Sequence, residues 1–215
     1  MFRMILPTTI PDVLAAEAQA GAQVRPIDAD GAAERTRADY GRTSRWVLGL
    51  VGTIGALVAV LIASFAVSVL ASGVDPLGDL VFAGFVGLVG AAFGVPAVWL
   101  LIALHRSGRR LARATAYWSA LPYHQGRRTP TRGDWFGVRF VGFSADLLPR
   151  LISSSLAGLA AIFAAAGGIR ALVVVAPAWE TFMWAGFAVL LGAVCAGQFG
   201  GVQRIQNGML ARDPA

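Results

Sequence analysis

One charged side chain lies within the apolar stretches of this chain, and it is the first candidate for chemistry. Arg170 interrupts a run from Leu151 to about Ala176 that holds no other charge. A charge inside such a run usually marks function, although an arginine near a membrane boundary can extend its guanidinium to the lipid headgroups. Arg170 follows Arg150 by 20 residues, about 30 Å along a helix, so we expect it near the outer boundary.

Three acids stand in two short loops that contain no base, and they are the natural partners of Arg170. They are Asp75, Asp79 and Glu180. We predict that Arg170 forms an ion pair with at least one of them. Such a pair would close the outer ends of the apolar segments.

Arginines beside aromatic side chains fill the segment 105–150. Arginines near an anionic leaflet contribute about 1 kcal/mol each, and aromatic rings suit the headgroup level. Nucleic-acid binding is the rival interpretation, but membrane topology already accounts for the charge, so we expect no nucleic acid. We favour a protein partner, with lipid anchoring as the alternative. The residues expected to contact lipid or a partner are Arg109, Arg110, Arg113, Trp118, Arg127, Arg128 and Trp135.

No pattern in the sequence is typical of catalysis or of a metal site. His105 and His124 are 19 residues apart, without the spacing of metal ligands. The stretch 144–146, Ser-Ala-Asp, has no histidine in a triad pattern, and no glycine-rich phosphate loop or nucleophile elbow occurs. We therefore expect no catalytic residue, no cofactor and no bound metal.

Four long apolar runs are the elements that must position these residues. At 56% hydrophobic content, the chain is too apolar for an ordinary soluble domain. The first run has 26 residues and reaches about 39 Å as a helix, enough to cross a bilayer. Continuous rather than alternating apolar sequence favours helices over a barrel. The runs are Trp46–Ala71, Leu80–Leu104, Leu151–Ala176 and Thr181–Val202.

The sequence therefore predicts an all-α integral membrane protein with four transmembrane helices arranged as two hairpins. The second of these helices is expected to continue beyond the membrane to about Ala120. We divide the chain into a cytoplasmic mobile tail (1–45), a first hairpin (46–104), a basic aromatic cytoplasmic loop (105–150), a second hairpin (151–202) and a cytoplasmic tail (203–215).

The first 45 residues do not resemble a secretory signal, because Pro7, Pro11 and Asp12 interrupt their apolar stretch. Six arginines, six acids and few large apolar residues indicate a mobile tail. Within it, we expect a short helix over 11–20, since Pro11 suits a first turn and Gly21 a stop.

The arginines predict the orientation of the spans. Seventeen of the 18 lie in the two tails and the central loop, which the topology places on one side of the membrane. The positive-inside rule then assigns both termini and this loop to the cytoplasm. Every basic residue is Arg, and Ala, Gly and Val are abundant. We take this composition as typical of a GC-rich bacterial genome, and we expect a bacterial cytoplasmic membrane.

Small residues recur along helical faces of the runs and predict close packing. In lipid, helices associate largely through close approach at small side chains. Packing inside one four-helix bundle explains these stripes, and a spare stripe would dock a partner helix. The residues are Gly87, Gly90, Gly94, Gly192, Ala196 and Gly200.

No Asp, Glu or His lies deep in any run, which argues against proton-coupled transport. We predict a non-catalytic accessory or scaffold subunit of a larger bacterial membrane complex, with membrane lipids and other membrane subunits as partners. The alternative is a small passive transporter, channel or lipid-handling protein. An enzyme acting on membrane lipid ranks third.

Overall fold

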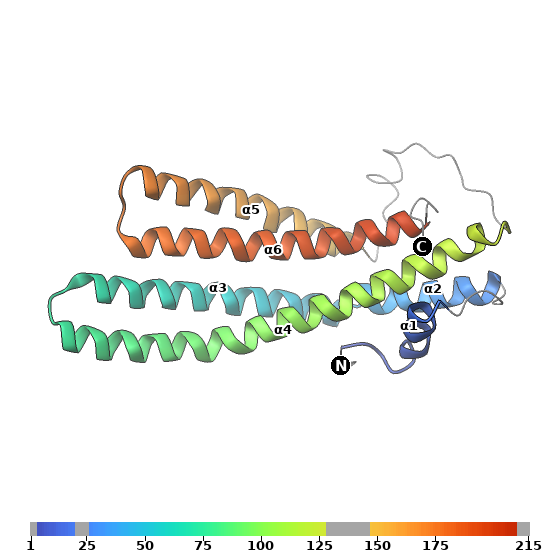
Figure 1. Ribbon diagram of the computed structural model, residues 1–215, viewed down its shortest axis with the longest axis horizontal. Helices are drawn as coiled ribbons and strands as arrows, with labels where there is room; N and C mark the ends of the chain where they lie inside the picture. The colour runs from blue at the N-terminus through green and yellow to red at the C-terminus, as the bar shows by residue number, and fades with distance from the viewer. Residues whose placement is uncertain (1–3, 20–25, 128–146, 210–215) are drawn as a thin grey trace. The chain divides into compact units, whose positions relative to one another are not determined.

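The computed structural model describes residues 4–19, 26–127 and 147–209, and every regular element in these ranges is a helix (Figure 1). Four helices, α3 to α6, are long and apolar enough to cross a membrane. The predicted all-α class and these four candidate spans are confirmed. The elements are α1 (Ile10–Glu17), α2 (Pro26–Gly41), α3 (Thr43–Ser72), α4 (Pro76–His124), α5 (Leu148–Val173) and α6 (Ala178–Met209).

Local sequence explains where the long helices begin and end. Gly73, with φ of 62°, follows α3 directly, as expected of a glycine that ends a helix in the left-handed conformation. Pro76 then opens α4, where its fixed φ suits the first turn. Asp79 and Glu180 lie in the first turns of α4 and α6, where a negative charge complements the helix dipole.

The chain folds into two compact units, each assembled from separate segments. Unit 1 comprises Met1–Trp46, Ala103–Ile152 and Gly197–Ala215. Unit 2 comprises Val47–Ile102 and Ser153–Ala196. Unit 2 thus contains most of the apolar runs, whereas unit 1 contains α1, α2 and one end of each of the other helices.

Within unit 2, glycines bring α3 and α4 into close contact. A Cβ atom at Gly94 would lie 3.0 Å from the Cβ of Ala59, and one at Gly90 would lie 3.1 Å from Cγ2 of Ile62. As the residue number falls along α4 it rises along α3, so the two helices run antiparallel. Close approach at glycine provides the dispersion contacts that hold helices together where water supplies no hydrophobic drive.

Helices α5 and α6 pack in the same manner within unit 2. A Cβ at Gly158 would lie 2.9 Å from Sγ of Cys195, and one at Gly167 would lie 2.8 Å from the Trp184 indole. The lone cysteine is thus a packing residue on α6. In the most apolar 18-residue window of each span, at most 17% of the residues are buried, and in α6 none is. Apolar side chains that face outward in this way suit a lipid environment.

Unit 1 has a buried core, and the N-terminal segment is part of it. Val13 of α1, Leu111 of α4 and Ile205 of α6 have no exposed surface or almost none. The segment 1–45, which we expected to be a mobile tail, contains α1 and α2, both packed on this core. The predicted helix over 11–20 corresponds to α1, and α4 extends to His124, slightly beyond the expected Ala120.

Candidate functional site

Arg45, at the start of α3, is a buried cation with only 3% of its surface exposed. Its Nη2 donates hydrogen bonds to Ser107 Oγ at 2.8 Å and to the Leu104 carbonyl at 3.5 Å. Its Nη1 donates to the Met4 carbonyl. Burial lowers the pKa of Arg45 to about 10, so the guanidinium remains charged at neutral pH. Arg45 therefore ties the N-terminal segment to α4 through charge-assisted hydrogen bonds.

A buried carboxylate lies close to this cation. Asp39 of α2 is 1% exposed, and its Oδ2 accepts a hydrogen bond of 2.8 Å from the Leu6 backbone N–H. Arg42 Nη1 lies 3.8 Å from the other carboxylate oxygen of Asp39. Attraction to Asp39 opposes the effect of burial on the pKa of Arg45. The carboxylate thus offsets part of the cost of burying the arginine.

Tyr40, the next residue of α2, joins α5 and α6 to the same cluster. The guanidinium carbon of Arg150 lies 4.4 Å from the centroid of the Tyr40 ring, a cation–π geometry. Burial raises the pKa of Tyr40 and lowers that of Arg150. The Tyr40 hydroxyl lies against Gly201 of α6, where a Cβ atom would collide with it. A glycine at 201 is therefore required for this contact.

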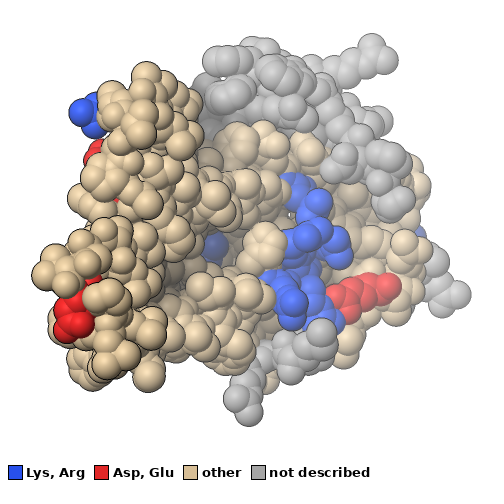
Figure 2. All heavy atoms as spheres, turned by 60° about the vertical axis from the view of Figure 1, so that its left-hand side comes forward, with Lys and Arg blue, Asp and Glu red and all other residues tan. Residues whose placement is uncertain are grey.

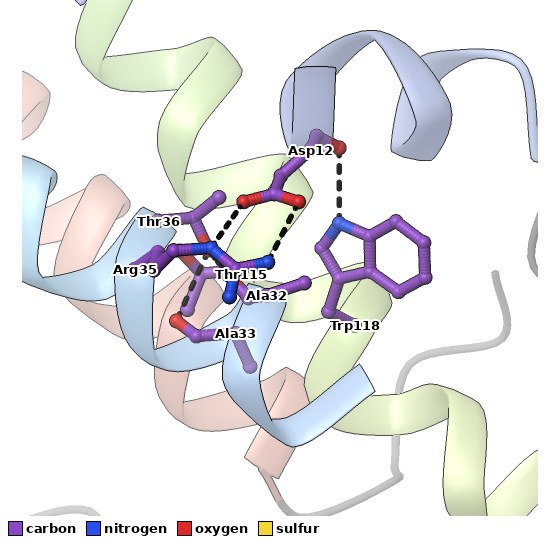
Figure 3. Close-up of polar contacts among 7 residues, drawn as sticks. All are labelled: Asp12, Ala32, Ala33, Arg35, Thr36, Thr115 and Trp118. Carbon is purple, nitrogen blue, oxygen red and sulfur yellow. Dashed lines mark hydrogen bonds and ion pairs between the residues drawn. The ribbon is translucent and has the colours of Figure 1, made fainter. Parts of the chain in front are cut away.

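Helix α1 is held against α2 and α4 by hydrogen bonds to both the side chain and the backbone of one residue, Asp12 (Figure 3). Its carboxylate accepts two hydrogen bonds from Arg35 of α2, from Nε at 2.8 Å and from Nη2 at 3.0 Å. Its backbone carbonyl accepts a hydrogen bond of 3.0 Å from Nε1 of Trp118. Trp118 itself is 4% exposed. These contacts fix both the position and the direction of α1.

Two threonines form a polar contact inside the α2–α4 interface (Figure 3). The hydroxyl oxygens of Thr36 and Thr115 lie 3.0 Å apart, and neither residue is exposed. Each hydroxyl also lies within hydrogen-bond distance of a carbonyl in its own helix, at 2.8 Å from Ala32 O and 2.9 Å from Leu111 O. Both buried hydroxyls are therefore satisfied, which avoids the cost of an unpaired polar group.

Glu17, the last residue of α1, pairs with Arg110 of α4. Both hydrogen bonds, from Nε and from Nη2 of Arg110, measure 2.6 Å. These bonds are the main cause of a lowered pKa for Glu17, burial opposes them, and the charge of Arg113 adds to the lowering. The Glu17 carboxylate is thus held in its ionised form.

Arg110 belongs to a row of arginines on α4. Arg106, Arg109 and Arg113 are exposed, and their spacing of three and four residues places them on one helical face with Arg110. In the part of the chain that the structure describes, none of the three exposed arginines has a carboxylate within ion-pair distance. Figure 2 shows basic side chains gathered on one face beside acidic ones, on an otherwise largely uncharged surface.

The residues predicted to meet lipid or a partner therefore have different environments. Arg109, Arg113 and Arg127 are exposed. Arg110 is paired with Glu17, and Trp118 lies in the core of unit 1 rather than on its surface. The remaining two, Arg128 and Trp135, lie outside the described residues.

The predicted outer-rim residues form two separate groups. Arg170 Nη1 lies 3.5 Å from Glu180 Oε1, and the Arg170 side chain is 71% exposed. Asp79 accepts hydrogen bonds from Ser72 Oγ at 2.8 Å and from the Asp75 backbone N–H at 3.4 Å. The two aspartates thus belong to the α3–α4 turn, and Glu180 is the acid that lies next to Arg170.

The residues predicted to pack between helices have different surroundings. Gly90 and Gly94 approach α3, whereas a Cβ at Gly87, Gly192 or Gly200 would meet nothing within 4 Å. Ala196 is exposed.

Sequence reasoning missed two close approaches in unit 1. One is Gly201 against Tyr40, and the other is Gly208 of α6 against the Ala116 backbone. The spacing of Gly201, buried Ile205 and Gly208 on one helical face was the available signal.

Sequence reasoning also missed the buried Asp39 and Arg45, whose signal was their position directly before the first apolar run. Among residues 4–19, 26–127 and 147–209, no group of three or more His, Cys, Asp and Glu side chains could hold a metal ion. Comparisons of the chain with protein-family models, curated proteins and solved structures found no match.

Proposed function

We propose that this protein is a non-catalytic accessory or scaffold subunit of a larger complex in a bacterial cytoplasmic membrane. In this proposal α3–α4 and α5–α6 insert as two hairpins, and both termini and unit 1 lie in the cytoplasm. The partner is a helix of another membrane protein, which docks on α6.

The face of α6 around Gly192 carries this proposal. No residue of its most apolar 18-residue window is buried, whereas each of the other three spans buries some. A Cβ at Gly192 would meet nothing within 4 Å, as at Gly84 and Gly87 of α4, so a partner could approach the backbone there. Because small residues allow helix backbones to approach in lipid, this face suits a partner helix better than it suits lipid tails.

The internal order of unit 1 supports a scaffold role. Its helices are fixed by the Asp12–Arg35 and Glu17–Arg110 ion pairs and by buried Arg45. A surface held in this way loses little conformational entropy when a partner binds. The exposed arginines on α4 remain available on that surface.

Purification in a mild detergent followed by mass spectrometry tests the role. We expect stoichiometric recovery of other membrane proteins, and we expect Gly192→Leu to abolish it without lowering the Tm. Gly84→Leu, on α4, is the matched control, because Gly84 also has open space around it. Recovery unaffected by Gly192→Leu, or a lone homo-oligomer that moves solute in liposomes, would overturn the proposal.

Cysteine labelling tests the orientation. In a Cys195→Ala background, an impermeant maleimide added to intact spheroplasts should label Val74→Cys, in the exposed α3–α4 turn. It should not label Arg127→Cys until the membrane is permeabilised. The opposite pattern would reverse the proposed topology.

A further inference from the structure

The arginine row of α4 begins where the apolar run ends. Arg106 follows Leu104 by two residues, and α4 is continuous from Pro76 to His124. At about 1.5 Å per residue, Arg106 and Arg113 lie about 3 and 13 Å beyond Leu104 along the helix. The polar layer of a bilayer occupies roughly 5–8 Å on each side of the hydrocarbon. The row therefore spans the headgroup layer and the adjacent water.

Among the described residues, Glu17 is the carboxylate that pairs with this row of four arginines. Like charges at spacings of three and four residues destabilise a helix. Glu17 bonds Arg110, but within the described ranges no carboxylate lies within ion-pair distance of Arg106, Arg109 or Arg113. An anion bound along this face would relieve the repulsion. Guanidinium groups suit a phosphate well, because their planar fork donates two parallel hydrogen bonds to it.

Glu17 shows that this face accepts an anion with two oxygens. Arg110 donates to both carboxylate oxygens, each at 2.6 Å, and Arg113 adds an electrostatic attraction. Glu17 is the last residue of α1 and is 42% exposed, whereas Val13 anchors the same helix in the core. The Glu17 side chain can therefore leave Arg110 while α1 stays docked.

We propose that the α4 arginine row, Arg106, Arg109, Arg110 and Arg113, is a binding site for the phosphate of an anionic phospholipid, and that Glu17 competes with the lipid for Arg110. A lipid is the source of the phosphate because the row starts at the end of an apolar helix, where headgroups are held at high local concentration. This site goes beyond the scaffold role and does not depend on a partner subunit.

Native mass spectrometry of the detergent-purified protein tests the site with phosphatidylglycerol and, as a neutral lipid, phosphatidylcholine. We expect selective retention of phosphatidylglycerol. The triple variant R106Q/R109Q/R113Q should reduce that retention at least fivefold. Glu17→Gln should increase it about two- to fivefold, since it removes the competing carboxylate. The matched control R132Q/R139Q/R212Q removes the same charge from other parts of the chain and should change retention less than twofold.

Three results would overturn the proposal. Equal losses in the two triple variants would show a general effect of net charge. Displacement of phosphatidylglycerol by an equal concentration of inorganic phosphate would identify free phosphate as the ligand. Unchanged retention in Glu17→Gln would exclude the competition. If the triple variant does not fold, as judged by circular dichroism, Arg109→Gln with the Glu17→Gln measurement decides the question.

Discussion

The two units of this protein differ in the number of charged residues that they contain and in where those residues lie. Of the 18 arginines, all but Arg170 fall in the segments of unit 1. Of the 12 acids, all but Asp75, Asp79 and Glu180 do so as well. Some of the charges in unit 1 form the buried cluster of Asp39 and Arg45 and the two ion pairs that hold α1. In unit 2 the few charges lie at the helix ends.

The units also differ in what holds their helices together. In unit 1, apolar residues such as Leu111 and Ile205 are fully buried, as in a soluble domain. The buried polar residues Thr36, Asp39, Arg45 and Thr115 each make at least one hydrogen bond. In unit 2, large apolar side chains face outward and glycines mediate the helix contacts. Burial of large apolar side chains stabilises unit 1, whereas close contacts at small residues hold the helices of unit 2 together.

The largest loss of stability is expected when the buried cation of unit 1, Arg45, is replaced. Arg45→Met removes the hydrogen bonds to Met4 O and Ser107 and one of the two positive charges that act on buried Asp39, the other being Arg42 at 3.8 Å. We expect a loss of about 3 kcal/mol, in the range found for broken buried pairs. Thermal unfolding in detergent and limited proteolysis of the N-terminal segment measure it. Arg127→Met, at an exposed position, should change the Tm very little. Equal Tm values for the two variants would contradict the conclusion that Arg45 ties the N-terminal segment to α4.

The next test concerns glycine packing in unit 1. A Cβ at Gly208 would collide with the Ala116 backbone, which cannot rotate away. We expect Gly208→Ala to cost about 2 kcal/mol, a usual cost of overpacking. Gly200→Ala, on the same helix with open space around it, should be neutral or stabilising by up to about 1 kcal/mol, since alanine favours helices. A destabilised Gly200→Ala beside an unchanged Gly208→Ala would refute this packing.

The same comparison in unit 2 should give a smaller effect. A Cβ at Gly94 meets the Ala59 side chain at 3.0 Å, and one at Gly87 meets nothing within 4 Å. Because α3 can yield by a few tenths of an ångström, Gly94→Ala should cost only about 1 kcal/mol relative to Gly87→Ala. Thermal unfolding in detergent measures the difference. A loss at Gly94 larger than that at Gly208 would reverse the contrast between the units.

The Glu17–Arg110 pair predicts a pH dependence confined to unit 1. Because the pKa of Glu17 is lowered from its ordinary value of 4.5, the pair contributes its full stability above about pH 4.5. That contribution disappears as the pH falls through the lowered pKa of the folded state. Below pH 4.5 the Tm of the native protein should therefore fall more than that of Glu17→Gln. The corresponding loss in the free energy of unfolding should be less than about 1 kcal/mol, because the pair is exposed. Parallel Tm profiles would contradict this.

The smallest effect is expected at the one arginine of unit 2. Arg170 is 71% exposed and lies 3.5 Å from Glu180, and pairs of this kind contribute about 0.2–1 kcal/mol. Arg170→Leu should lower the Tm in detergent only slightly, and the loss should shrink at high salt because salt screens exposed charges. A loss as large as that of Arg45→Met would contradict the small contribution expected of this exposed pair.

The sequence by itself determined the four long helices. An apolar run of about 20 residues with at most one charge is a local property, and its length and composition suit a helix that crosses a membrane. The positions of the charges between these runs also predicted that Arg170 would pair with Asp75, Asp79 or Glu180. In the structure, Glu180 lies next to Arg170.

Only the tertiary structure showed that α1 and α2 pack on a core and that Arg110 pairs with Glu17. Composition indicated a mobile tail, because α2 has few large apolar residues. However, Ala29, Ala32 and Tyr40 are buried in unit 1, since small side chains let the helix approach the core closely. The contacts of Arg45 with Met4 and Ser107, and of Glu17 with Arg110, join residues 41 to 93 positions apart. No local pattern encodes such pairs, because they exist only when the chain has folded.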